Sequence, residues 1–115
     1  MRAVNDLAGS SWYSVRCVFH TPSDDPDSRD HFEERITLWL ADSVDQAIER
    51  AEEEAGEYAA GLTRTHYCGL AQAYRVVTST QPGDGDEVFS MLRDSELAPH
   101  TYLKSYFDTG GEHRQ

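Results

Sequence analysis

Basic residues are scarce in this sequence, and that scarcity narrows the choice of partners. Ten lysine and arginine residues stand against 21 aspartate and glutamate residues, which gives a formal net charge of -11. Such a charge repels phosphate backbones and anionic lipid headgroups, and it favours a basic protein partner or none. We therefore expect no direct binding to nucleic acid and none to a membrane surface.

Cysteine and long apolar runs are scarce as well. Cys17 and Cys68 lie far apart, and Met1–Ser10 contains no apolar stretch of the kind found in secretion signals. The two cysteines are therefore expected to be reduced, buried and unreactive rather than joined in a disulfide. No stretch approaches the roughly 20 apolar residues that a membrane span needs. These absences indicate a cytoplasmic protein.

The length predicts a single domain. A chain of 115 residues without a long polar linker has room for one hydrophobic core. We place a flexible N-terminal tail at residues 1–11, the domain at residues 12–109 and a C-terminal tail at residues 110–115.

Stretches in which apolar and polar residues alternate predict β-strands. They are residues 12–20, 32–41 and 67–78. The first stretch has an apolar side, and the second has one made of Ile36, Leu38 and Leu40. If both apolar sides face the core, a mixed set from these two strands remains on the other face of the sheet: Trp12, Arg16, Arg35, Thr37 and Trp39.

A capped helix is predicted after the second strand. The Ser43 hydroxyl is placed to accept from the amide of Gln46, whose side chain reaches back to the cap as a capping box requires. Apolar residues recur at helical spacing after Ser43, so one side of this helix packs on the sheet. Glutamates cover the other side, which forms an acidic helix face: Glu49, Glu52, Glu53 and Glu57.

The C-terminal part predicts a hairpin and a second helix. Residues 82–85 read Pro-Gly-Asp-Gly, which is strong turn chemistry, and residues 87–93 then predict a further strand beside the third. Pro99, followed by leucine and aromatic side chains at helical spacing, predicts a short C-terminal helix. The expected fold is α+β, with a four-stranded, mainly antiparallel sheet (β-β-α-β-β) in spatial order 2-1-3-4 and the main helix on one face.

Four short segments, taken in order, are similar to a known family. Trp12–Arg16 (WYSVR) opens the first strand, and Phe32–Trp39 (FEERITLW) lies in the second. Ala71–Arg75 (AQAYR) and Asp84–Ser90 (DGDEVFS) follow in the third strand and the hairpin. Their order resembles the bacterial domain of unknown function 4288 family, over about Trp12 to Phe107. The resemblance supports the fold and implies a small intracellular bacterial protein, but the family brings no established activity, cofactor or catalytic residue.

No group of residues predicts a catalytic or metal site. Four metal-ligating side chains would gather if the first and third strands pair: Cys17, His20, His66 and Cys68. A separation of three residues, however, places Cys17 and His20 on opposite faces of a strand. The aspartates of residues 24–30 lack the turn glycine and the late glutamate of an EF-hand. We expect no catalytic residue, no metal and no cofactor.

The mixed sheet face suggests a role in binding. The C-terminal helix, a second copy of the chain or a ligand could cover this face, and we favour a homodimer through it. The favoured interpretation is a small acidic, non-catalytic protein-interaction module. Its predicted partner-binding residues on this face are Trp12, Arg16, Thr37 and Trp39.

Two other functions remain open. An immunity- or antitoxin-type inhibitor would bind a basic partner protein through the acidic helix face, with Glu49 and Glu53 as binding residues. A small enzyme would have its pocket near His66. Binding measured at low and high salt distinguishes the inhibitor from a module with an apolar interface. A complex held by charge weakens as ionic strength rises, whereas an apolar complex persists.

Overall fold

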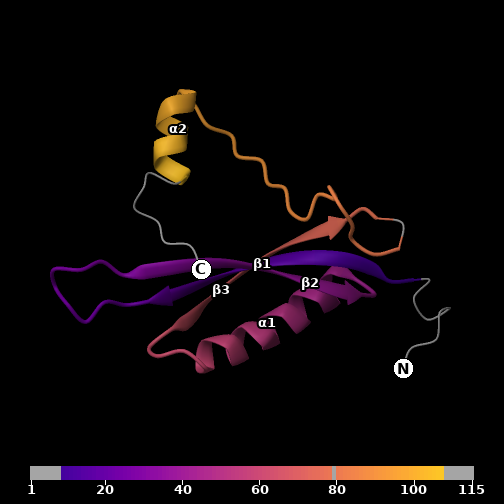
Figure 1. Cartoon of the computed structure of the whole chain (residues 1–115), viewed down its shortest axis with the longest axis horizontal. Coiled ribbons are helices and arrows are strands. Elements are labelled where there is room, and N and C mark those ends of the chain that lie inside the picture. Colours follow the sequence, from indigo (N-terminus) through magenta and orange to yellow (C-terminus); the bar gives the residue numbers. More distant parts are fainter. Residues whose placement is uncertain (1–8, 79, 108–115) are drawn as a thin grey trace.

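The fold is built from one antiparallel sheet and two helices (Figure 1). The computed structural model describes residues 9–78 and 80–107. In chain order the elements are β1 (Ser11–Thr21), β2 (His31–Ala41), α1 (Val44–Ala60), β3 (His66–Val76) and α2 (Pro99–Tyr106). The three strands lie in the order β2-β1-β3, and α1 covers one face of the sheet (Figure 1). The architecture is therefore α+β.

The predicted tails lie mostly outside the described part of the chain. Residues 1–8 and 110–115 fall outside it, while Ser11 already belongs to β1. The three strands lie within two residues of their predicted ends, and the two helices begin where Ser43 and Pro99 predict.

β1 is the central strand because it pairs along both of its edges. It forms a hairpin with β2 that stays in register over the full length of both strands. With β3 it pairs from Trp12 to His20, and this second ladder is irregular between Cys17 and Phe19. Gly69 lies at the irregularity with φ of 81°, a conformation that glycine adopts without steric cost.

The register sorts the β2 side chains differently from the sequence prediction. Residues directly opposite each other in an antiparallel pair share a face. Trp39 lies opposite Tyr13 and Thr37 lies opposite Val15, so these β2 side chains belong to the face that packs on α1, the helix face. The other face, called the second face below, carries Trp12, Ser14, Arg16, Val18, His20, Phe32, Glu34, Ile36, Leu38, Leu40, Gln72, Tyr74 and Val76.

The predicted grouping of the two apolar sides on one face is therefore wrong. Alternation shows that the two sides of a strand differ, but the pairing register decides which side of one strand meets which side of its neighbour. The helix face of β2 is polar and aromatic because α1 supplies matching groups. Arg35, for example, bonds to Glu54 and lies over the ring of Tyr58.

The core lies between α1 and the helix face. Buried alanines recur at every fourth position of the helix: Ala47, Ala51, Ala55 and Ala59. These small side chains let α1 approach the sheet closely, and Val15 and Phe19 of β1 fill the space between them. The Ser43 hydroxyl accepts from the amide of Gln46 at 3.1 Å, as predicted. The Gln46 side chain accepts from Asp42 rather than from Ser43, so the capping box is confirmed on one side.

The predicted strand at residues 87–93 does not form, so the four-stranded β-β-α-β-β sheet is wrong. The turn before it is present, because the Asp86 amide donates to the carbonyl of Gly83 at 3.1 Å. After the turn the chain runs over the second face instead of beside β3. Turn chemistry predicts a reversal of direction, but the side chains beyond the turn decide where the returning segment lies. Phe89 lies against Arg16 and Tyr74 of the second face.

α2 confirms the predicted short C-terminal helix, with Pro99 in its first turn. It stands on the opposite side of the sheet from α1 and away from the strands (Figure 1). Within residues 9–78 and 80–107, α2 has no extensive packing against a strand or against α1. Neither of the described helices has the length and apolar character needed to cross a membrane.

Candidate functional site

The second face is covered in part by residues 80–91, called the crossing segment below. Side chains of β1 hold this segment by its backbone. The indole Nε1 of Trp12 donates to the carbonyl oxygen of Thr80 at 3.1 Å, and the Ser14 hydroxyl donates to the carbonyl oxygen of Val88. Ser14 is fully buried, so this bond lies beneath the segment rather than at its rim.

Arg16 connects the parts of the second face. Its Nη2 donates to Gln72 Oε1 at 2.6 Å, and its Nη1 lies 3.3 Å from the carboxylate of Glu34. The guanidinium carbon lies 5.2 Å from the centre of the Phe89 ring, and that ring lies 6.2 Å from the ring of Tyr74. The buried Nε of Arg16 has no hydrogen-bond partner among the described residues. Arg16 thus links β2, β3 and the crossing segment.

The β2 side of the second face stays open. Three apolar side chains form an open strip there: Phe32, Ile36 and Leu38 are exposed by 65%, 45% and 44%. Glu34 lies between them along the strand, and its side chain is 61% exposed although it pairs with Arg16. Exposed apolar side chains that gather on one face of a small soluble domain are typical of contact sites. The open strip is the candidate functional site.

The helix face carries a network of charged and aromatic side chains. Arg35 forms two bonds with the Glu54 carboxylate, at 2.6 and 2.9 Å, and its guanidinium lies 3.9 Å from the centre of the Tyr58 ring. The Tyr58 hydroxyl donates to Glu33 at 2.8 Å. The bidentate bond to Glu54 raises the pKa of Arg35. Since these groups satisfy one another between α1 and β2, the network joins the helix to the sheet.

The cysteines differ from each other, and the prediction that both are buried is wrong. Cys17 is buried on the helix face, whereas Cys68 is exposed in β3. Burial raises the pKa of the Cys17 thiol, and the bond with Tyr67 opposes that rise. The pKa of Tyr67 is raised as well, by burial and by its bond to Glu52. Cys17 is consequently a neutral thiol, which is a poor nucleophile.

The structure divides the predicted partner-binding residues among three places. Trp12 and Arg16 lie on the second face, where they hold the crossing segment. Thr37 and Trp39 lie on the helix face, bonded to each other at 2.7 Å, so they do not join the first pair. Glu49 and Glu53 are exposed on α1. Their predicted roles in binding stay predictions.

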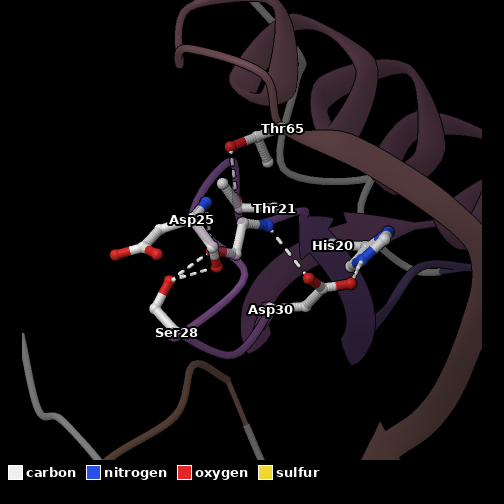
Figure 2. A network of polar contacts seen from close by, with 7 residues as sticks. His20, Thr21, Asp25, Ser28, Asp30 and Thr65 are labelled. Carbon is white, nitrogen blue, oxygen red and sulfur yellow. Dashed lines mark hydrogen bonds and ion pairs between the residues drawn. The ribbon is translucent and has the colours of Figure 1, made fainter.

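Polar side chains gather at the tip of the β1–β2 hairpin (Figure 2). His20 Nε2 lies 2.8 Å from Asp30 Oδ2, and the backbone amide of Ser23 donates to Asp30 Oδ1 at 2.9 Å. The Thr21 and Thr65 hydroxyls share a hydrogen bond of 2.7 Å. The bonds from Ser23 and His20 lower the pKa of Asp30. These contacts hold the loop closed. His20 and Asp30 therefore have a structural role in the loop.

The four side chains weighed and rejected as a metal site in the sequence are brought only partly together. His20 and His66 are directly opposite each other on β1 and β3, while Cys17 lies on the helix face. Among the described residues, no three histidine, cysteine, aspartate or glutamate side chains are arranged to hold a metal ion.

Sequence reasoning missed Ser14 and Phe89, the residues that place the crossing segment. A signal for Ser14 was present, because a small hydroxyl in the middle of a central strand needs a partner when it is buried. Nothing in the sequence names that partner as the carbonyl of Val88, which lies 74 residues further along the chain.

A protein-family model matches most of this fold. The model of the family described as a domain of unknown function (DUF4288) matches residues 12–90, which is more than half of the chain. The match spans the three strands and α1 and reaches into the crossing segment, and it ends before α2. No curated protein and no solved structure matches the chain. The chain belongs to the DUF4288 family of domains of unknown function.

Proposed function

We propose that this chain is a small acidic, non-catalytic protein-interaction module that binds a protein through the open strip. One observation carries the proposal: Phe32, Ile36 and Leu38 stay exposed beside a crossing segment that covers another part of the same face. Burying apolar surface is the main favourable term in most protein association, at about 25 cal/mol per Å². A protein partner with an apolar patch would gain this term at the open strip.

The chemistry of the described residues supports binding rather than catalysis. The buried thiol of Cys17 has a raised pKa, so it lacks the character of a nucleophile. The carboxylate of Asp30 already accepts from the His20 ring and from the Ser23 amide, so it holds the loop. His66, near which an enzyme pocket was predicted, is exposed on β3. The contacts of Cys17 and Asp30 are structural.

The experiment is a capture assay with two matched variants. Ile36→Asp with Leu38→Asp places charge in the open strip, while Val77→Asp makes the same change at an exposed valine outside it. The wild type and Val77→Asp should retain the same partner from lysate of the source cells, and the strip variant should lose it. Ile36→Ser with Leu38→Ser repeats the test if the aspartates unfold the domain. Retention of the partner by both folded strip variants would contradict the proposal.

A second candidate function is an immunity- or antitoxin-type inhibitor that binds a basic protein through the acidic helix face. The observation that supports this function is that the glutamates of α1 differ in their contacts. Glu52 and Glu54 are engaged by Tyr67 and Arg35, whereas an outer row stays exposed: Glu49, Glu53 and Glu57. Rows of exposed charge steer the approach of an oppositely charged partner, and they act mainly on the association rate. Charge reversal in this row would slow such binding and leave contacts at the open strip unchanged.

A further inference from the structure

α2 and the open strip are two apolar surfaces of one chain that do not meet. Leu103 and Phe107 are each 54% exposed, and Tyr106 is 49% exposed. α2 spans eight residues. Isolated helices shorter than about 12–15 residues are marginal in water, so α2 needs a surface to pack on. Its contacts within residues 80–107 are local: Arg93 bonds to Tyr102 at 3.2 Å and lies 4.3 Å from the centre of the Tyr106 ring.

The arm, residues 92–107, extends away from the sheet that it could cover. Figure 1 shows α2 on the side of the second face but apart from the strands. Leu92 is 95% exposed, so the start of the arm does not rest on the body. Pro99 holds Ala98 in an extended conformation, with φ of -64° and ψ of 153°, which stiffens the hinge in front of α2.

Charge makes α2 compatible with the open strip. The segment Pro99–Phe107 contains no carboxylate, although the whole chain has 21, and it carries Lys104, the only lysine. A helix of this kind approaches an acidic domain without repulsion between like charges. Glu34 lies within the open strip, between Phe32 and Ile36, and its carboxylate is 61% exposed beside its contact with Arg16, so a lysine could approach it from solvent. The apolar and the charged groups of the two surfaces are therefore complementary.

We propose that the chain forms a two-fold symmetric dimer in which α2 of each copy lies on the open strip of the other. This proposal rests on the proposed function, because it names a second copy as the partner of the open strip. Exchange of identical segments is a low-cost route to dimers. In such a dimer one contact is made twice, so both arms are packed and both strips are covered.

The first test is zero-length cross-linking of the full chain with a carbodiimide, which joins a lysine to a carboxylate in direct contact. Lys104 is the only lysine, so every link from a lysine side chain begins there, and peptide mass spectrometry identifies the carboxylate at its other end and separates links made by the N-terminal amine. Dimeric protein by light scattering, with Lys104 joined to Glu34 between two chains labelled with different nitrogen isotopes, is the expected result. The same link within one chain of a monomer would overturn the exchange, because α2 would then cover its own strip.

The second test mixes two variants that should each be monomeric. Leu103→Asp with Phe107→Asp places charge in the arm and leaves the open strip unchanged. Ile36→Asp with Leu38→Asp places charge in the open strip and leaves the arm unchanged. Each change at the centre of a contact should raise the dimer Kd about 30-fold or more. A mixture restores one of the two contacts, so association should return with weaker affinity than in the wild type. A dimer that survives the arm substitutions would show that the strips meet directly, which overturns the proposal.

The two proposals fail in different ways. If the wild type is a monomer and its open strip still captures another protein, the exchanged dimer is wrong and the interaction module stands. If the wild type is a monomer and strip substitutions change no capture, both are wrong.

Discussion

Ser14 has more influence on the fold than its size suggests. It lies in the middle of the central strand, it is fully buried, and its hydroxyl donates to the backbone of the crossing segment. Arg16, two residues later, adds the ring of Phe89 to the same attachment. Two side chains of one strand thus decide that residues 80–91 lie on the sheet and not beside it.

Ser14→Ala should therefore loosen the crossing segment. The substitution removes one hydrogen bond from a buried position, which is expected to lower the free energy of unfolding by about 1 kcal/mol. Urea unfolding followed by circular dichroism measures the change as a lower midpoint at an unchanged slope. Ser90→Ala is the matched control, because Ser90 is exposed in the same segment and its substitution should cost less than about 0.5 kcal/mol. Equal midpoints for the two variants would contradict this role of Ser14.

At the scale of elements, the sequence predicts what local chemistry decides and misses what contacts between distant residues decide. The three strands, the cap at Ser43 and the helix start at Pro99 each rest on a local pattern, and all are found. The placement of residues 87–93 depends on Ser14 and Phe89, which lie far apart in the sequence. The alternation of apolar and polar residues in residues 87–93 matches a strand. This pattern does not determine whether the segment pairs with the edge of the sheet or lies across its face.

The residues of the candidate site could not be named from the sequence for the same reason. A sheet face with unexplained side chains was expected. The exposed apolar residues of the second face are Phe32, Ile36 and Leu38, while Thr37 and Trp39 lie on the helix face, and their predicted role in binding stays a prediction. A shift of one residue in register exchanges the two faces of a strand, so the face could not be assigned before the pairing of β1 with β2 was known.

The loop between β1 and β2 should respond to pH through Asp30. Its pKa is lowered, so its ionised form stabilises the folded hairpin, and this stability is present above the ordinary aspartate pKa of about 3.9. It is lost as pH falls through the lower pKa of the folded state. Asp30→Asn should therefore increase hydrogen exchange at the Ser23 amide at neutral pH, since that amide donates to the carboxylate.

The difference between Asp30→Asn and the wild type should disappear in acid, where both side chains are neutral. Asp27→Asn, which changes an exposed carboxylate of the same loop, should leave the exchange of Ser23 unchanged at either pH. A difference between Asp30→Asn and the wild type that persists in acid would show that the ionised carboxylate is not what holds the loop.

At the scale of the whole molecule, charge and apolar surface act in opposite directions. A net charge of -11 repels one copy of the chain from another, while in the proposed dimer the open strip and α2 would draw two copies together. The first effect is screened by salt and the second is not. The response to ionic strength therefore separates a contact between two copies from a contact with a basic protein.

The exchanged dimer should become tighter as salt rises. Screening shortens the range of repulsion between the two acidic copies from about 30 Å at 0.01 M ionic strength to about 3 Å at 1 M, while the apolar contact at the open strip remains. Sedimentation equilibrium across this range should give a falling Kd. Glu49→Lys with Glu53→Lys changes the net charge from -11 to -7, since each reversal adds two charges, so this variant should dimerise more tightly at low salt and respond less to added salt. Both residues are exposed on α1, on the opposite side of the sheet from the strip, so the gain would arise from net charge. A dimer that dissociates as salt rises would be held by ion pairs, and the apolar strip would then not be its main contact.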